Sequence, residues 1–538
     1  MIVPVLLFVI AYAALLITGH AVLLPVVLLA AVFLFRGMMC IDRRLEPFAA
    51  VLVLFAAQNV AAGMLGGTHA EASLKAAVLL SALLPACLVL AAWTVSPWRA
   101  WRWLSIEIRG AELWLLVIAF AYTALVLARW FTGPFALSVS ISALRNALTP
   151  AYGILVVLLL PPELRPTIEE IVSFLRRWGV LIALFGFVEI TVLGDRFWSG
   201  FAHIGAAIHV KELSVARRSG PTVPADFYTY FGHHYFRRLV SLYGDAITTG
   251  YYLAVAFLAA VIGPSRRGLR AFGLRSVWVV VLAAALGLSF VKGGFQIVAV
   301  GVVVALLLHT WLRSVFERGA LVVLLACALC AIGAQATGLM SQSSVQLHVS
   351  GLTSAVHAVT DHVGSSLAWG KGIGTAGADS VYIQRHAGQL VPARETPGLD
   401  NGAGTILVST GALGLAGVLA LFALLIPTCA RRARKNRASA VAAVATVALL
   451  VNFLLQEHAL TLVPSFPFWV LAAIGFGAAG TQPTAKPTVI SLVPAARPGW
   501  RPMVRTRVPI AGFDPRAAHQ RRKNSGVRRR REPLPAGR

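Results

Sequence analysis

Charged residues are scarce in this sequence. They make up 13% of the 538 residues, whereas hydrophobic side chains make up 58%. So much apolar surface excludes an ordinary soluble globular protein, and apolar runs of about 20 residues are typical of helices that cross a bilayer. The short alternating segments of a transmembrane barrel are absent. The composition therefore predicts an all-α fold, that of a polytopic integral membrane protein.

Acidic residues are the rarer charged type. The chain has 21 Asp and Glu against 47 Lys and Arg, a formal net charge of +26. Most basic residues lie in short loops and in the C-terminal tail, so the preference of Lys and Arg for the cytoplasmic face explains them better than nucleic-acid binding. The tail at 481–538 is rich in Pro and Arg and is expected to be disordered, lying against anionic membrane lipid. Specific protein or nucleic-acid binding by the tail stays an alternative, although we expect no nucleic-acid partner.

Cysteine is also rare, with five in the chain, which predicts no disulfide framework. Cys327 and Cys330 form a CxxC inside an apolar run, where small packing residues are a better interpretation than a redox or zinc site. The loop histidines His348, His357 and His362 lack the compact spacing of metal ligands, and an amphipathic surface segment at 345–363 fits the first two better. We therefore expect no metal and no cofactor.

The apolar runs predict about fourteen membrane spans. The spans fall near 2–17, 21–35, 46–63, 74–93, 111–129, 147–161, 178–193, 247–263, 276–290, 294–312, 319–336, 403–427, 440–456 and 464–480. Under this count the basic loops all fall on one side, which places both termini in the cytoplasm. Met1–Leu16 lacks a basic n-region and is interpreted as the first span rather than a cleaved signal peptide.

This count divides the chain into six regions. Transmembrane helices occupy 1–193, 247–336 and 403–480, and the basic tail follows at 481–538. Two large hydrophilic loops, at 194–246 and 337–402, fall on the extracytoplasmic side. Their arginines do not contradict this side, because long loops translocate largely regardless of charge. A large loop between membrane spans is the expected place for chemistry.

Two outer segments carry cations close to the membrane. Arg237 and Arg238 lie just before the span at 247–263, and a planar, permanently charged guanidinium suits a diphosphate. Interfacial anchoring at headgroup level is the alternative for both. Lys292 lies in a very short outer turn, where a cation tends to face the bundle interior or a lipid phosphate. Snorkelling to the outer headgroups is the alternative for Lys292.

The second large loop holds a glycine segment, with glycines at 370, 372, 374 and 377. It is not a P-loop, because no Gly-Lys-Ser/Thr follows, and no βαβ unit surrounds it as a dinucleotide site would require. The remaining interpretation is a flexible turn whose free backbone N–H groups approach a phosphate or a sugar.

A polar pair, Asp400 and Asn401, ends the same loop and opens the apolar run 403–425, with Arg385 upstream. A carboxylate at the foot of a helix, near outer cations, suits a general base for a sugar hydroxyl. Asp and Asn are also favoured helix N-caps, and both interpretations can hold together. Glycines 411, 414 and 417 on the run are expected to let neighbouring helices approach closely.

In their order and placement these motifs resemble the O-antigen polymerase and O-antigen ligase superfamily of bacterial envelope glycosyltransferases. The resemblance covers roughly 236–426. Its features are an Arg-x-x-Ser-x-Tyr-x-Asp pattern at 238–245, a Ser-x-x-Lys-Gly-Gly turn at 289–294 where the family usually has Ser-Arg-Gly, and the glycine segment followed by a polar pair. Ligases commonly have His-Asn where this chain has Asp400-Asn401, which favours a polymerase.

The resemblance implies an inverting, metal-independent glycosyltransferase of the bacterial inner membrane. Its donor is expected to be a glycan on undecaprenyl diphosphate. Arg238, with Arg237 and Lys292, is then expected to hold the diphosphate, and Asp400 to be the base. The other expected substrate-binding residues are Asp245, Gly372, Gly374, Arg385 and Asn401. Envelope proteins that regulate chain length or export are expected partners.

Several functions stay open at this point. Polymerisation of lipid-linked repeat units, for O-antigen, capsule or exopolysaccharide, is the leading one, and ligase-type transfer to a lipid or protein acceptor is the second. A transporter or flippase of lipid-linked glycans is supported by polar residues within spans, such as Gln58, Glu189 and Asn452, but the chain shows no internal repeat. A non-catalytic scaffold of an envelope complex is the last alternative.

Overall fold

The computed structural model describes a little more than half of the chain. The described residues are 44–45, 48–49, 51–53, 55–56, 110–137, 139–160, 165–202, 204, 223–231, 234–264, 269–308, 353–360, 366–377, 380, 383 and 401–477. The predicted spans at 2–17, 21–35, 74–93 and 319–336, most of the span at 46–63, and the tail at 481–538 lie outside this set.

The described part is mainly helical, and its helices support a multi-pass membrane protein. Five helical stretches are long and apolar enough to cross a membrane, and four apolar helices are shorter. The helices are α6 (Ala111–Phe131), α7 (Ile141–Leu159), α8 (Ile168–Val188), α11 (Ala246–Ile262), α12 (Leu269–Ser289), α13 (Lys292–Leu307), α18 (Gly402–Ala433), α19 (Arg437–Leu455) and α20 (Leu462–Gly477). Each one overlaps a span that the sequence predicts.

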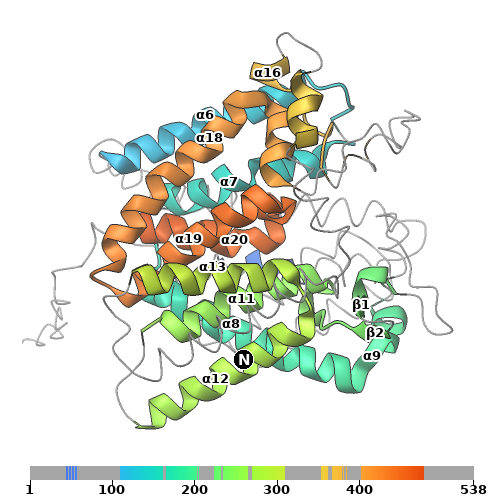
Figure 1. Ribbon diagram of the computed structural model, residues 1–538, viewed down its shortest axis with the longest axis vertical. Helices are drawn as coiled ribbons and strands as arrows, with labels where there is room; N and C mark the ends of the chain where they lie inside the picture. The colour runs from blue at the N-terminus through green and yellow to red at the C-terminus, as the bar shows by residue number, and fades with distance from the viewer. Residues whose placement is uncertain are drawn as a thin grey trace, which may run out of the picture. The chain divides into compact units, whose positions relative to one another are not determined.

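The helices pack side by side (Figure 1). α18 contacts α6 and α19, α20 contacts α7 and α19, and α11 contacts α8, α12 and α13. Small residues allow these approaches: a Cβ at Gly153 of α7 would lie 2.5 Å from the Trp469 Cβ of α20. Such close approach is the usual basis of helix association in membranes.

The helix ends gather in two groups. At one end, Arg176 of α8 donates to the Pro264 carbonyl (3.5 Å) and Asn436 bonds to Glu169. We call this the basic end; it includes the starts of α6, α8 and α19 and the ends of α7, α11, α18 and α20. At the other end, the Tyr252 hydroxyl of α11 donates to the Val463 carbonyl of α20 (3.1 Å). We call this the opposite end; it includes the starts of α11, α13, α18 and α20 and the ends of α8, α12 and α19.

Several helices extend further into the basic loops than the apolar runs predict. α8 begins at Ile168, so Arg176 and Arg177 lie inside a helix and not in the loop before residue 178. A capping box sets this start: Thr167 N donates to Glu170 Oε2 (2.7 Å), and Glu170 N donates to Thr167 Oγ1 (3.3 Å). The apolar run shows which residues lie in the hydrocarbon layer, whereas the capping box shows where the helix begins. The two positions need not coincide.

The arginines of the basic end bind the last carbonyls of neighbouring helices. Arg165 donates to Leu158 (2.6 Å) and Leu160 (2.7 Å) at the end of α7. In the same way Arg275 donates to Ala260 (2.8 Å) and Val261 of α11, and Arg432 to Gly475 (2.8 Å) and Phe476 of α20. The carbonyls of a last helical turn lack intrahelical donors and carry the negative end of the helix dipole. These arginines therefore have a structural role as C-terminal caps.

The first large loop begins later than predicted and is not wholly irregular. The helix of α8 continues through a π-helical turn η4 (Glu189–Leu193), α9 (Gly194–Arg196) and a second π-helical turn η5 (Phe197–Phe201). After η6 (Ala225–Phe227), strands β1 (Tyr228–Phe231) and β2 (His234–Arg237) pair antiparallel, with Tyr228 opposite Arg237. This hairpin departs from the predicted all-α fold, and it lies outside the spans.

The second large loop is helical at 353–360 and in α16 (Ser366–Trp369). In the first of these, Ala355 and Val359 are buried and pack with Leu407 and Val408 of α18, whereas His357 is exposed. The amphipathic character that the sequence predicts for 345–363 is confirmed for these described residues.

Candidate functional site

Two of the motif segments lie against each other at the opposite end. Arg238, which follows β2, donates from Nε to the Ser289 carbonyl at the end of α12 (3.0 Å). The next residue, Leu239, donates from its backbone N–H to the Leu288 carbonyl (3.0 Å). The pattern at 238–245 and the turn at 289–294, which are about fifty residues apart in the sequence, are therefore neighbours in the fold.

Arg238 is partly buried at this junction. Besides Ser289, it donates from Nη1 to the Asp226 carbonyl (3.2 Å). Burial lowers the pKa of Arg238, and the carboxylates of Asp245 and Asp226 partly counter that effect. Arg238 makes no ion pair with a described residue. Its guanidinium therefore stays charged, held in place by carbonyl groups and without a paired anion.

Lys292 is the second cation at this junction. It is the first residue of α13, just before the predicted span at 294–312, and its side chain is half-buried. Burial lowers the pKa of Lys292, and the positive charge of Arg238 lowers it further. No described residue accepts a hydrogen bond from its Nζ, and α13 has no acidic residue in its first turn and no side-chain cap at Val291. Two mutually repelling cations thus lie beside an uncapped helix N-terminus.

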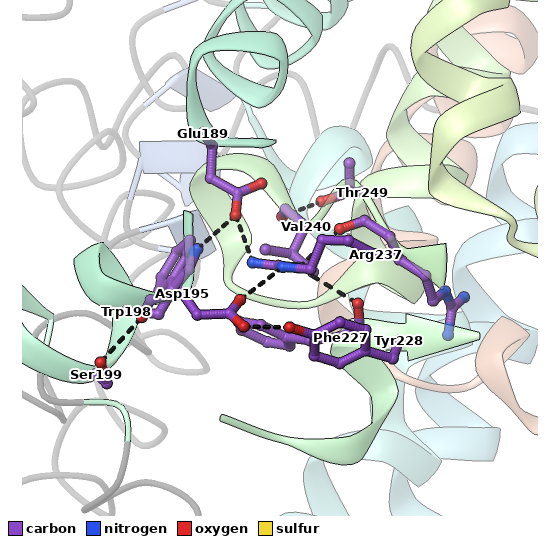
Figure 2. Close-up of polar contacts among 10 residues, drawn as sticks. Glu189, Asp195, Trp198, Ser199, Phe227, Tyr228, Arg237, Val240 and Thr249 are labelled. Carbon is purple, nitrogen blue, oxygen red and sulfur yellow. Dashed lines mark hydrogen bonds and ion pairs between the residues drawn. The ribbon is translucent and has the colours of Figure 1, made fainter. Parts of the chain in front are cut away.

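Arg237 has a different environment, shown in Figure 2. Its guanidinium pairs with Glu189 (Nη2 to Oε1, 2.6 Å) and with Asp195 (Nε to Oδ1, 2.7 Å), and it lies over the Phe227 ring at 4.6 Å. Asp195 also accepts from the Tyr228 hydroxyl. These contacts fasten the β1–β2 hairpin to the end of the helix at 168–201. Binding of a diphosphate by Arg237 stays a prediction; the described contacts neutralise its charge.

The remaining residues of the pattern at 238–245 shape the turn. Asp245 is the N-cap of α11 and accepts from Ile247 N (3.0 Å) and Thr248 N (3.1 Å). Ser241 has a φ of 49° and donates to the Ile182 carbonyl of α8 (2.6 Å). Tyr243 is buried and stacks on Tyr252 at 4.7 Å. The substrate-binding role predicted for Asp245 is untested, and its observed contacts are those of a helix cap.

A polar network follows the start of α13. The Tyr251 hydroxyl of α11 lies 2.8 Å from Asn452 Oδ1 and 2.9 Å from Gln456 Oε1. A Cβ at Gly293 would lie 2.5 Å from the same Gln456 oxygen and 2.7 Å from the Tyr251 hydroxyl. Glycine is therefore favoured beside Lys292, because a larger residue would push the Gln456 amide and the Tyr251 ring aside. Asn452 and Glu189, polar residues that support a transporter, both have structural partners.

The glycine segment packs against a break in α18. Gly411 has a φ of 72° and interrupts the helix, which exposes the carbonyls before it. The Val408 carbonyl accepts from Lys371 N (2.7 Å), and the Ser409 carbonyl accepts from Gly372 N (3.1 Å). Backbone groups inside a membrane protein need such partners. The sequence predicts free backbone N–H groups in the glycine segment. That prediction is wrong for Lys371 and Gly372, whose N–H groups bind these carbonyls.

The other glycines of these segments have steric roles. A Cβ at Gly374 would lie within 3.2 Å of both Phe135 and Ile383. Gly377 lies against Glu457. In α18, a Cβ at Gly417 would lie 3.1 Å from Tyr122 of α6, so the predicted close approach is confirmed there. Gly411 has instead the role of a helix break. Sugar binding by Gly372 and Gly374 stays a prediction.

Asn401 is the N-cap of α18. Its Oδ1 accepts from Gly404 N (2.9 Å), and its Nδ2 donates to the Leu454 carbonyl at the end of α19 (2.5 Å). The N-cap interpretation is therefore confirmed for Asn401. Asp400 and Arg385 lie outside the described residues, and their predicted roles stay predictions.

These contacts bring all four motif segments to the end of α19 and the turn that follows it. The pattern at 238–245 contacts the turn at 289–294, which contacts Gln456; the glycine segment contacts Glu457; and Asn401 contacts Leu454. The turn at 456–459, with η8 (Glu457–Ala459), was not among the predicted site residues. Gln-Glu-His between two apolar runs is a polar triplet in the sequence, but nothing in its spacing links it to the other motifs.

Among the described residues, no group of three or more His, Cys, Asp or Glu side chains is placed to hold a metal ion. What converges at this end is a set of cations, amides, a hydroxyl and several carboxylates. Such groups can bind an anion and move a proton. A scan of family models finds no match to this chain, and a search of curated proteins finds none either.

Proposed function

We propose that this chain is a glycosyltransferase that polymerises oligosaccharide repeat units carried on undecaprenyl diphosphate. One observation carries the proposal: Arg238 and Lys292 lie together beside the uncapped start of α13, and neither is paired with a described carboxylate. A site that keeps two cations together without an ion pair to a described carboxylate favours an anionic ligand with more than one charge. A diphosphate has that charge.

The start of α13 adds to this preference. The first N–H groups of a helix have no intrahelical acceptor, and they carry the positive end of the helix dipole. A cation at this position is unfavourable unless an anion is also bound there. In glycosyl transfer from a diphosphate donor, negative charge develops on the leaving diphosphate. Arg238 and Lys292 would stabilise that charge in the transition state.

The location of the site agrees with a lipid-linked substrate. The site lies at the end of the bundle away from the arginine caps, and under the positive-inside rule that end faces outward. We place the reaction at the extracytoplasmic face of the bacterial inner membrane, with about fourteen spans and both termini inside. A polyprenyl chain would then remain in the bilayer while its diphosphate reaches Arg238.

Two alternatives differ from this proposal in testable ways. A ligase would use the same diphosphate site but pass finished polymer to a lipid or protein acceptor. A flippase or transporter would need polar groups near the membrane midplane. The polar span residues Glu189 and Asn452 contact Arg237 and Tyr251 at the opposite end, which weakens the support for transport.

The glycan profile of cells that lack the chain separates these functions. We expect single repeat units to accumulate and to be transferred onward. Polymer that remains on the lipid carrier would indicate a ligase, and repeat units trapped on the cytoplasmic face would indicate a flippase. Either profile would overturn the proposal.

Arg238→Gln tests the site itself. Loss of the guanidinium should lower the rate of polymerisation about 100- to 1,000-fold, the usual effect of removing one stabilising group from a leaving-group or oxyanion site. Polymer length in complemented deletion cells, with protein level in the membrane, is the measurement. Arg196→Gln is the matched control, because Arg196 is an exposed arginine near the same hairpin. Polymer of normal length with Arg238→Gln would contradict the proposal.

A further inference from the structure

One carboxylate at the opposite end belongs to none of the sequence motifs. Glu457 starts η8 directly after α19 and is 8% exposed. A Cβ at Gly377 would clash with its Oε1, and the same Cβ would lie 3.0 Å from Thr405 Cγ2 in the first turns of α18. Gly377 has a φ of 93°, so glycine is favoured there for its backbone as well. Three segments therefore meet at Glu457.

Thr405 gives a second, independent observation. Its side chain is 9% exposed, and its buried Oγ1 has no hydrogen-bond partner among the described groups. A buried polar group without a partner costs about 1–3 kcal/mol, and a native protein retains such a group where a ligand or an ordered water completes it. Thr405 and Glu457 flank the same glycine. A sugar hydroxyl between them would donate to the carboxylate and accept from the threonine.

The other described carboxylates of this end have different positions. Glu189 and Asp195 hold Arg237, and Asp245 caps α11. Asp226 lies beside Arg238, on the side of the leaving group. An inverting displacement places the base on the face opposite the leaving group. Glu457 lies on a different side, because it borders Gly377 and Thr405, whereas Arg238 borders Ser289.

We propose that Glu457 is the catalytic base and that Thr405 orients the acceptor hydroxyl. This inference rests on the proposed function. The acceptor oxygen attacks the anomeric carbon of the donor sugar and forms the new glycosidic bond. The bond from that carbon to the diphosphate oxygen breaks, and its electron pair leaves with the diphosphate. The hydroxyl proton passes to the Glu457 carboxylate and then to solvent.

The test uses the full-length protein in detergent micelles and lipid-linked repeat units extracted from cells that lack the chain. Glu457→Gln keeps the size of the side chain but removes the base. It should lower kcat about 100- to 10,000-fold, the contribution typical of general-base catalysis, and leave the KM for the donor within about threefold. Glu112→Gln, at the basic end, is the matched control and should retain wild-type kcat.

Chemical rescue separates a base from a structural carboxylate. Glu457→Ala should be inactive, and sodium formate, which fits the space left by the carboxylate, should restore kcat at least about tenfold, whereas sodium chloride should not. Thr405→Val should lower kcat about tenfold, and Thr405→Ser should retain most of the activity. Thermal unfolding of each variant shows that the protein has folded.

The outcomes are distinct. Glu457→Gln with near wild-type kcat, or folded Glu457→Ala without formate rescue, would overturn the assignment. Formate rescue of Asp400→Ala or Asp226→Ala in place of Glu457→Ala would assign the base to that residue instead. If the wild-type protein consumes no donor, or if Arg238→Gln is fully active, the proposed function fails and this inference falls with it. Loss of activity in Arg238→Gln together with full activity in Glu457→Gln would overturn this inference alone.

Discussion

The two ends of the helix bundle use cations in different ways. At the basic end, Arg165, Arg275 and Arg432 each donate to carbonyls in the last turn of a helix. At the opposite end, Lys292 stands at the start of a helix and donates to no described residue. A cation is stabilised at a helix C-terminus and destabilised at an N-terminus. The basic end thus has a structural reason for its charges, whereas Lys292 has no such reason among the described residues, as the proposed diphosphate site requires.

Arg238 has features of both ends. Like the arginine caps, it donates to a helix C-terminal carbonyl, that of Ser289. Unlike them, it lies beside a cation at the start of a helix, Lys292, and lowers the pKa of that residue. The carbonyl contacts fix the position of the guanidinium, and the neighbouring lysine makes the pair attractive to an anion. The carbonyl contacts therefore set the position of Arg238, whereas the second positive charge comes from Lys292.

Among the changes that compare the two ends, the largest effect is expected from removal of the charge that has no structural partner. Lys292→Gln should lower the rate of donor consumption about 10- to 100-fold, because a charge-assisted hydrogen bond to a phosphate contributes about 1.5–3 kcal/mol. The thermal midpoint should not fall, since a repulsion with Arg238 is also removed. Lys435→Gln, an exposed lysine at the basic end, is the control. A variant that loses Tm in proportion to its activity would assign Lys292 a structural role.

An intermediate effect, on stability alone, is expected at the basic end. Arg432→Gln removes the donors to Gly475 and Phe476 and should destabilise the protein by about 1–3 kcal/mol, seen as a lower Tm. Activity per folded molecule should stay at the wild-type level. Arg434→Gln, on an exposed residue of the same turn, should change neither quantity. Loss of specific activity in Arg432→Gln would erase the contrast between the two ends.

The smallest effect is a pH dependence. Because the pKa of Lys292 is lowered, its positive charge is lost at a less alkaline pH than that of an ordinary lysine. Donor affinity should therefore decline as the pH rises through the alkaline range, and Lys292→Arg, which stays charged, should remove the decline. The KM for the donor from neutral to alkaline pH is the measurement. Parallel profiles for the two proteins would show that Lys292 does not contact the donor.

The sequence predicts the spans better than the ends of the helices. Apolar runs locate each of the described long helices, because hydrocarbon imposes their length and composition. The starts are less predictable: α8 begins at the Thr167 capping box, and its arginines at 176 and 177 were assigned to a loop. Basic residues can belong to a helix that projects beyond the hydrocarbon, and hydropathy cannot separate such a helix from a loop.

The site was predictable in part. Arg238 and Lys292 stand out as cations next to apolar runs, and the fold brings their segments together. Two adjacent residues can nevertheless have different environments. Arg237, next to Arg238, pairs with Glu189 and Asp195, which are more than forty residues away in the sequence. The proximity of Glu457 to Gly377 was not predictable, because it depends on the packing of α18 against α19. Long-range pairing of this kind leaves no local pattern in the sequence.

Direct binding of undecaprenyl diphosphate to the purified protein tests the central claim without knowledge of the sugars. We predict that the wild-type protein binds it, that Arg238→Gln and Lys292→Gln each raise Kd about tenfold or more, and that Arg432→Gln leaves Kd within about twofold. Equal Kd values for the wild type and the two site variants, or weaker binding only in Arg432→Gln, would contradict the assignment of a diphosphate site to the end of the bundle that carries Arg238 and Lys292.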